Sequence, residues 1–93
     1  MFHYVYLLES IKHDNLYIGY TSDLKRRLVE YNRGLNFSTK SYKPWRLIHY
    51  EAYRNEDDAK RREGYLKTSQ GSRLLKRMLK SSFHCLERSS YLK

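Results

Sequence analysis

The chain has 93 residues, of which 40% are hydrophobic and 31% are charged. This length and composition predict one soluble domain with one core. They exclude a disordered polymer and a membrane protein, because no apolar run approaches the roughly 20 residues of a bilayer span. Nineteen Lys and Arg against ten Asp and Glu give a formal charge of +9, which favours a polyanion such as nucleic acid as the partner.

Residues 2–9 and 16–20 are rich in β-branched and aromatic types, so we expect two strands joined as a hairpin. One face of the first strand carries Phe2, Tyr4, Tyr6 and Leu8. On the second strand, Tyr17 and Gly19 share a face. The missing side chain at Gly19 leaves room beside the Tyr17 phenol, lets another backbone approach, or marks a bulge.

A helix follows the hairpin. Thr21 or Ser22 can cap its start, with Asp23 in the first turn, and the chain leaves it near residues 32–34, where a glycine suits the C′ position. The polar stretch 35–44 ends in proline and predicts a loop.

Residues 45–53 have the composition of a third strand. Asn55 can cap a helix over 56–67, whose first turn is acidic and whose later turns are basic, as the helix dipole prefers. We expect "TSQG" at 68–71 to break this helix, and a last helix to follow over residues 72–80.

Arg27 lies among apolar residues of the first helix. At about 100° per residue it shares an arc with Leu24, Leu28 and Tyr31. A guanidinium keeps its charge there, so it needs an anion, either a carboxylate of this protein or a phosphate of a ligand. Tyr31, four residues on, is within reach of whatever Arg27 holds. The alternative is a structural arginine that extends to solvent.

Glu63 repeats this arrangement with the opposite charge, because it shares an arc of the second helix with Ala59 and Leu66. Its carboxylate could pair with Arg27 or hold a divalent metal. Mg²⁺ suits such a site, since it binds through one or two carboxylates and keeps waters for its other positions. Zinc is not expected, because the histidines lack the spacing of a zinc site.

Five motifs in this order resemble the GIY-YIG nuclease superfamily, in particular its small stand-alone bacterial members related to the N-terminal nuclease domain of the excision-repair subunit UvrC. They are "YVY" at 4–6, "YIG" at 17–19, "TSDLKRRLVEYN" at 21–32, "KPWRLIHYE" at 43–51 and "AKRREGYLK" at 59–67.

The resemblance covers residues 2 to about 80 and implies an α/β (α+β) fold, a small three-stranded antiparallel sheet flanked by helices in the order ββαβαα. We therefore expect a GIY-YIG nuclease-like domain over residues 1–80. Residues 81–93 form a C-terminal tail without a clear period, which we expect to be disordered or a helical extension.

The resemblance also implies a reaction, the hydrolysis of a DNA phosphodiester with one Mg²⁺ or Mn²⁺. Glu63 would hold the ion, which neutralises the scissile phosphate and the leaving oxygen, and Arg27 would stabilise the charge of the transition state. Tyr6 and Tyr17 would position or deprotonate the attacking water. Tyr31 stands where many relatives have histidine, and a phenol is a poor base at pH 7 unless a cation or metal lowers its pKa.

Two other functions stay open. The first is a non-catalytic nucleic-acid-binding module, and the second is covalent catalysis by Tyr6 or Tyr17. Two departures from the family bear on the choice, because Tyr20 replaces a lysine of the excision-repair proteins and no asparagine follows about a dozen residues after Glu63.

The expected partner is DNA, including structured or branched DNA of repair or recombination, bound by a monomer or weak dimer. The DNA contacts are predicted for Lys25, Arg26, Lys60, Arg61, Lys67, Lys76 and Arg77. Cys85 is the single cysteine and the N-terminus lacks signal-peptide features, so we expect a cytoplasmic protein.

Overall fold

The structure is a computed structural model of the chain and describes residues 1–13, 15–36 and 39–82. Its elements are β1 His3–Ser10, β2 Leu16–Thr21, α1 Leu24–Asn32, the 3₁₀ helix η1 Lys40–Tyr42, β3 Trp45–Tyr53, α2 Glu56–Leu66 and α3 Ser69–Met78. The predicted order ββαβαα is confirmed, with η1 as a short addition inside the predicted loop. From residue 83 on, the predicted tail lies outside the described residues.

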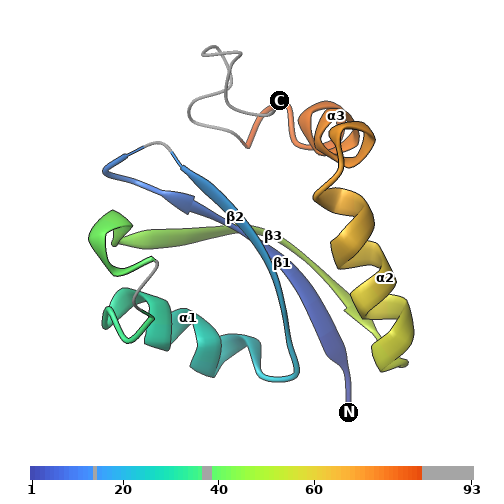
Figure 1. Cartoon of the computed structure of the whole chain (residues 1–93), viewed down its shortest axis with the longest axis horizontal. Helices are drawn as coiled ribbons and strands as arrows, with labels where there is room; N and C mark the ends of the chain where they lie inside the picture. Colours follow the sequence, from blue (N-terminus) through green and yellow to red (C-terminus); the bar gives the residue numbers. More distant parts are fainter. Residues whose placement is uncertain (14, 37–38, 83–93) are drawn as a thin grey trace.

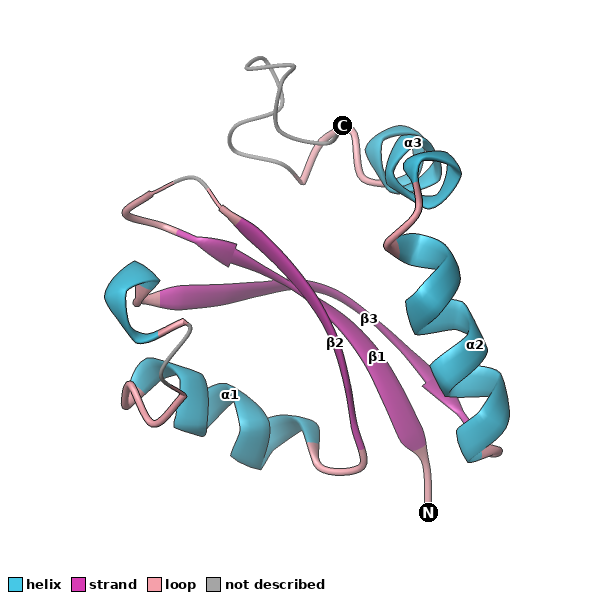
Figure 2. Ribbon diagram, viewed as in Figure 1, coloured by secondary structure: helices cyan, strands magenta, loops and turns pink. Residues whose placement is uncertain are grey.

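The three strands form one antiparallel sheet in the order β2-β1-β3, with α1 on one face and α2 and α3 on the other (Figures 1 and 2). Because β1 is central, its side chains alternate between the two faces of the sheet and enter two separate cores, so the expectation of one core was wrong. The α2 and α3 side contains Val5, Leu7, Ala59, Leu66 and Leu75. The α1 side contains Tyr6, Leu8, Tyr31 and Trp45. No helix in the described part is long and apolar enough to cross a membrane.

A β-bulge in β3 changes the alternation of its side chains. Leu7 pairs with His49 but Leu8 pairs with Leu47, so Ile48 is an extra residue on β3. Leu47 and Tyr50, three positions apart, therefore both face α1. In a regular strand they would point to opposite faces.

Asp23 caps α1, so the predicted cap at Thr21 or Ser22 was wrong. The Asp23 carboxylate accepts a hydrogen bond from the Arg26 backbone N–H at 3.2 Å, which satisfies a donor left open at the start of the helix. At the other end, Gly34 has a φ of 74° and lies just after the helix, as predicted for a C′ glycine.

Asn55 caps α2 as predicted, its side chain accepting from the Asp57 backbone N–H at 2.8 Å. The break between the last two helices, predicted for residues 68–71, is shorter than expected, because α2 ends at Leu66 and α3 begins at Ser69. Thr68 caps α3 through a 3.1 Å hydrogen bond from the Gly71 backbone N–H, and "SQG" forms the first turn of that helix.

Gly71 lets α3 approach the end of α2 closely. A Cβ at this position would overlap the carbonyl oxygen of Tyr65 and the Cα of Leu66. The residue is buried, and the neighbouring atoms are backbone, which cannot turn aside as a side chain can. The glycine therefore serves helix packing and does not end a helix.

Glu51 joins β3 to α2 through a partly buried ion pair. Its carboxylate accepts from the Arg62 guanidinium at 2.9 and 3.2 Å, from the Tyr53 hydroxyl at 2.7 Å, and lies 3.1 Å from the His49 ring. Burial alone would raise the pKa of Glu51, but these hydrogen bonds outweigh it and lower the pKa to about 2. Since Arg62 precedes Glu63, this contact also helps to set the orientation of Glu63.

We expect Gly71→Ala to destabilise the protein by roughly 1–3 kcal/mol, because α3 must move away from α2. Gly64→Ala is the matched control, since a Cβ at Gly64 meets no atom within 4 Å. Its better helix propensity should stabilise the protein by about 0.5–1 kcal/mol. Urea unfolding of both variants measures the difference, and effects of the same sign would contradict the close packing.

We expect the stability provided by Glu51 to be fully present above pH 4.5 and to be lost as the pH falls toward 2, because its folded pKa lies below the ordinary value of 4.5. Glu51→Gln should therefore cost roughly 2–3 kcal/mol at neutral pH and little near pH 2. Thermal melting of the wild type and of Glu51→Gln across this pH range tests the prediction. Asp58→Asn, which removes an exposed pair with Arg61, should change stability little at any pH.

Candidate active site

The candidate site lies at the β2 edge of the sheet, where α1 and α2 approach from opposite faces (Figure 1). Tyr6 on β1 pairs with Gly19 on β2, and a Cβ at Gly19 would overlap the hydroxyl and ring of Tyr6. The ring of Tyr6 therefore lies over β2. The space predicted beside Tyr17 is filled by Tyr6, and Gly19 is needed because no other residue leaves room for that ring.

Three tyrosines meet beneath α1. The hydroxyls of Tyr6 and Tyr31 are 2.9 Å apart, and both residues are almost fully buried. The ring of Tyr17 lies 5.5 Å from that of Tyr31, measured between centroids. The structure thus brings together Tyr6 and Tyr17, predicted from the strands, with Tyr31, predicted from the helix.

The pKa is raised for two of these hydroxyls, those of Tyr6 and Tyr31. Burial raises the pKa of Tyr31 well above its ordinary value of 10, and hydrogen bonding to Tyr6 and Tyr17 raises it further. Burial also raises the pKa of Tyr6, an effect that the Tyr31 hydrogen bond and the charge of Arg27 only partly offset. At neutral pH both are protonated, so they can orient a ligand by hydrogen bonds but cannot accept a proton as phenolates.

Arg27 borders the cluster, and within the described part of the chain it has no close anionic partner. Its side chain is 42% exposed, and the carboxylate that it contacts in the described chain, Glu30, lies 3.9 Å from its Nε. A hollow of about 140 Å³ opens beside it, lined by Arg27, Glu30, Tyr31, Leu35 and Asn36. A half-exposed guanidinium with such a loose ion pair can bind a phosphate.

Glu63 approaches the same cluster from α2, close enough for its charge to raise the pKa of Tyr6. Its side chain is 23% exposed and one oxygen lies 3.0 Å from the Lys67 ammonium. Of the alternatives left open by the sequence, pairing of Glu63 with Arg27 was wrong, because the ion pair described for Glu63 is with Lys67.

The donor set available to a metal is small. Across residues 1–13, 15–36 and 39–82, no group of three or more His, Cys, Asp or Glu side chains could hold a metal ion. Among the described residues, Glu63 therefore does not belong to a group of three or more such side chains, and a metal held by it would take few ligands from the protein. One oxygen ligand from the protein suits Mg²⁺ or Mn²⁺, which complete their coordination with water and substrate oxygens, and it does not suit zinc.

Asn32 has a positioning role that the sequence did not reveal. At the end of α1 its side chain accepts from the Trp45 backbone N–H at 2.6 Å and donates to the Trp45 carbonyl at 3.2 Å. This double hydrogen bond holds the helix that carries Arg27 and Tyr31 against β3. The sequence shows an amide side chain at the end of this helix, which can form hydrogen bonds with backbone groups. It does not show the partner, because Trp45 is 13 residues away in the chain.

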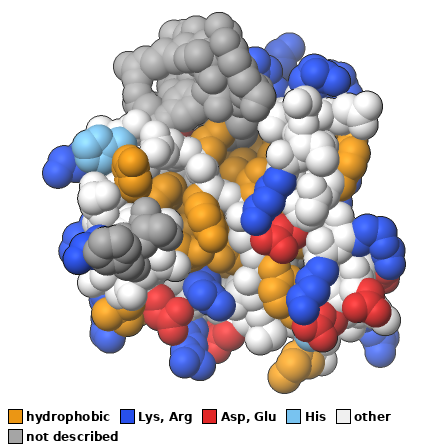
Figure 3. Space-filling view, viewed as in Figure 1, with side chains coloured by type: hydrophobic (Ala, Val, Ile, Leu, Met, Phe, Trp, Pro, Cys, Tyr) orange, Lys and Arg blue, Asp and Glu red, His pale blue; other side chains and the backbone are white. Residues whose placement is uncertain are grey.

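The seven basic residues predicted to contact DNA lie on three helices or their ends: Lys25, Arg26, Lys60, Arg61, Lys67, Lys76 and Arg77. Arg26, Lys60, Arg61 and Lys67 form ion pairs with nearby carboxylates. In Figure 3, hydrophobic side chains lie in the middle of the face between α1 and α2, with Lys and Arg on both sides. Their contact with DNA stays a prediction.

Comparison with known proteins agrees with this architecture. A family model described as the GIY-YIG catalytic domain matches residues 2–77. The UPF0213 protein of Haloquadratum walsbyi is 37% identical over 68 residues, which are 72% of this chain and 75% of that protein. The UPF0213 protein of Staphylococcus saprophyticus is 32% identical over 75 residues, which are 80% of this chain and 90% of the relative.

A solved structure of a similar protein has the same fold. The solution NMR structure of a UPF0213 protein from Bacillus halodurans superposes with a TM-score of 0.53 at 29% identity, covering 97% of this chain and 95% of the other. The predicted family and fold are therefore confirmed, and the domain implies nucleic-acid binding. The chain belongs to the GIY-YIG nuclease superfamily and groups with its small UPF0213 members.

Proposed function

We propose that this protein is a metal-dependent endonuclease that hydrolyses DNA phosphodiester bonds at the β2 edge of its sheet. The observation that carries the proposal is the convergence on Tyr6 of four side chains from three elements, α1, β2 and α2. The Tyr31 hydroxyl touches Tyr6 directly, while Tyr17, Arg27 and Glu63 are close enough for their charges to affect its pKa. Polar groups gathered this way in a partly buried site are typical of catalysis.

Arg27 would bind the scissile phosphate and stabilise the charge that builds up on it. The guanidinium remains charged when half-buried and offers paired N–H donors that match phosphate oxygens. Its loose contact with Glu30 leaves these donors available. The hollow that Arg27 lines together with Tyr31 would give a ligand access to the arginine.

The tyrosine hydroxyls would position the attacking water. Because Tyr6 and Tyr31 are protonated at neutral pH, each can donate one hydrogen bond and accept another. Tyr31 fixes the direction of the Tyr6 hydroxyl through their 2.9 Å contact. The buried rings also restrict how much solvent reaches the reacting phosphate.

Glu63 would hold the divalent cation, with Mg²⁺ or Mn²⁺ fitting its single carboxylate. When bound, such an ion supplies charge neutralisation for the phosphate and the leaving oxygen. The pair with Lys67 does not prevent this, since the Lys67 side chain is 52% exposed and such i,i+4 pairs contribute little stability. The same lysine can then turn to a phosphate of the DNA.

A non-catalytic nucleic-acid-binding module is the second candidate. It is favoured by one observation, the raised pKa of Tyr31, which leaves the described site without a side chain placed as an obvious base. The two candidates share the DNA partner, and we propose structured DNA of repair or recombination as the substrate in the catalytic case. They differ in whether phosphodiester bonds are cut.

We expect Glu63→Gln to abolish cleavage of supercoiled plasmid in Mg²⁺ or Mn²⁺ while DNA binding is unchanged or tighter, because a negative charge near the phosphates is lost. Mg²⁺ should raise the melting temperature of the wild type and not that of the variant. Glu56→Gln is the matched control, since Glu56 lies on the same helix and pairs with Lys60 at the same i,i+4 spacing. A Glu63→Gln protein that still cuts would rule out the metal assignment.

We expect Arg27→Ala to reduce the cleavage rate by about 100-fold or more, the scale of losing one preorganised charge at a reacting centre. The melting temperature should stay within a few degrees, because the pair with Glu30 is loose. Arg26→Ala is the control for stability, as its 75% exposed side chain also pairs with Glu30. A large loss of stability in Arg27→Ala alone would show that the arginine is structural.

A further inference from the structure

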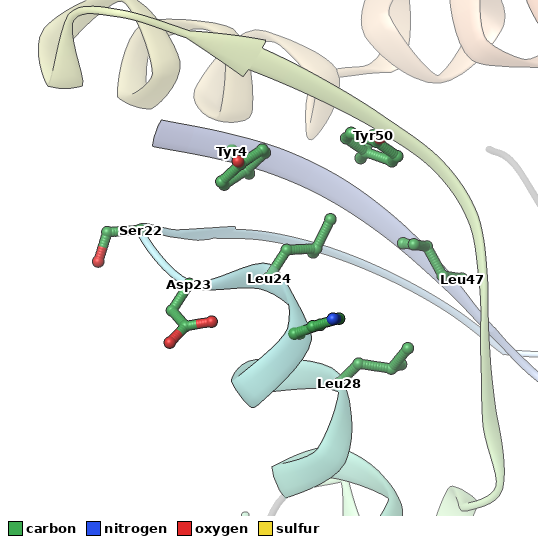
Figure 4. Close-up of a pocket in the computed structure, with 8 residues that line it drawn as sticks. Tyr4, Ser22, Asp23, Leu24, Leu28, Leu47 and Tyr50 are labelled. Atoms are coloured by element: carbon green, nitrogen blue, oxygen red, sulfur yellow. The ribbon is translucent and has the colours of Figure 1, made fainter. Parts of the chain in front are cut away.

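A second hollow lies on the α1 face of the sheet. Figure 4 shows it between α1 and strands β1 and β3, with Tyr4 and Tyr50 extending from the sheet toward Leu24 and Leu28 of the helix. Its volume is about 360 Å³. That is toward the lower end of the roughly 300–1,000 Å³ typical of small-ligand sites.

The walls of this hollow are aromatic and aliphatic. The rings of Tyr4 and Tyr50 are 6.0 Å apart at 63°, an edge-to-face pair that leaves ring surface free. Tyr50 is 53% exposed, although it is a large side chain. It reaches this face only because the bulge at Ile48 brings it to the same side as Leu47.

Two charged side chains line the hollow, Asp23 and Lys25, and the Asp23 carboxylate already accepts a hydrogen bond from the Arg26 backbone N–H. Among the described residues, Lys25 has no carboxylate partner. Arg26, the next residue on α1, is exposed, and the chain has a formal charge of +9. A ligand that is planar and apolar in one part and negatively charged in another matches this combination.

We propose that the hollow binds an unpaired nucleobase of the bound DNA strand, stacked on Tyr50, with Lys25 on the adjacent phosphate. This inference rests on the proposed function, and it names the substrate class as DNA with an unpaired nucleotide near the cleaved bond. Stacking on an aromatic ring tolerates every base, because each base has a π-face. The site therefore recognises DNA structure and not sequence.

The position of the hollow relative to the candidate active site supports one strand reaching both. Tyr4 is two residues from Tyr6 on the same face of β1, a distance of about 7 Å along the strand. The hollow opens at the start of α1, where Ser22 and Asp23 form its edge. A strand leaving Arg27 would pass the exposed Lys25 and Arg26 before its base enters the hollow.

The test measures binding in EDTA, so that cleavage plays no part. Two duplexes carry the fluorescent base 2-aminopurine, one as a single unpaired nucleotide and one paired with thymine in the same sequence. We expect the wild type to bind the unpaired probe about tenfold more tightly, with emission reduced by stacking. Tyr50→Ala should remove this preference, and its affinity for the paired probe should change less than twofold.

Three variants serve as controls. Tyr50→Phe keeps the stacking ring and should keep the preference. Tyr65→Ala removes another exposed tyrosine, on α2 and away from this hollow, and should leave both affinities unchanged. Lys25→Ala should weaken binding to both probes equally and reduce the salt dependence, as expected for a phosphate contact. Melting temperatures verify that each variant is folded.

The outcomes separate this proposal from the proposed function. A wild type that binds the paired probe but shows no preference for the unpaired one overturns the nucleobase site and leaves the endonuclease proposal intact. Retention of the preference in Tyr50→Ala, or its loss in Tyr50→Phe, also overturns it. A wild type that binds neither probe overturns both proposals.

Discussion

The hydrogen bond between the buried hydroxyls of Tyr6 and Tyr31 is the interaction on which the candidate site depends. It connects the central strand to α1 in surroundings where an unpaired hydroxyl would cost about 1–3 kcal/mol. The contact forms because Gly19 has no side chain, so the Tyr6 ring can lie across the neighbouring strand. Arg27, on the helix that carries Tyr31, is brought to the β2 edge by this contact.

Two further contacts hold the charged residues of the site, and each joins a helix to β3. Asn32 fixes the end of α1 to Trp45, while Glu51 fixes α2 through Arg62. Each helix is thus attached to the strand at the far edge of the sheet, and presents its charged residue toward β2 on the opposite edge. Such contacts keep Arg27 and Glu63 in place although, among the described residues, neither has a strong internal partner. Preorganisation of this kind is what electrostatic catalysis requires.

The local structure could be predicted from the sequence wherever it depends on neighbouring residues. The strand composition of residues 45–53 predicted β3 with its observed bounds, and Asn55 was identified as a cap. The errors came from contacts between elements. Gly71 was interpreted as a helix breaker, but it lies within α3 because the end of α2 packs against it. The cap of α1 was also misplaced, since several residues before that helix can accept a hydrogen bond.

By itself the sequence determined the order of the elements, the alternating faces of β1 and the family, since five short motifs at fixed spacing carry that information. It also identified Arg27 and Glu63 as charged residues on apolar arcs. Only the tertiary structure decided which partners they have, that the pKa of Tyr31 is raised, and that Tyr50 faces α1. A partner, a buried hydroxyl and a bulge each depend on distances between segments far apart in the chain, and periodicity along one segment does not contain those distances.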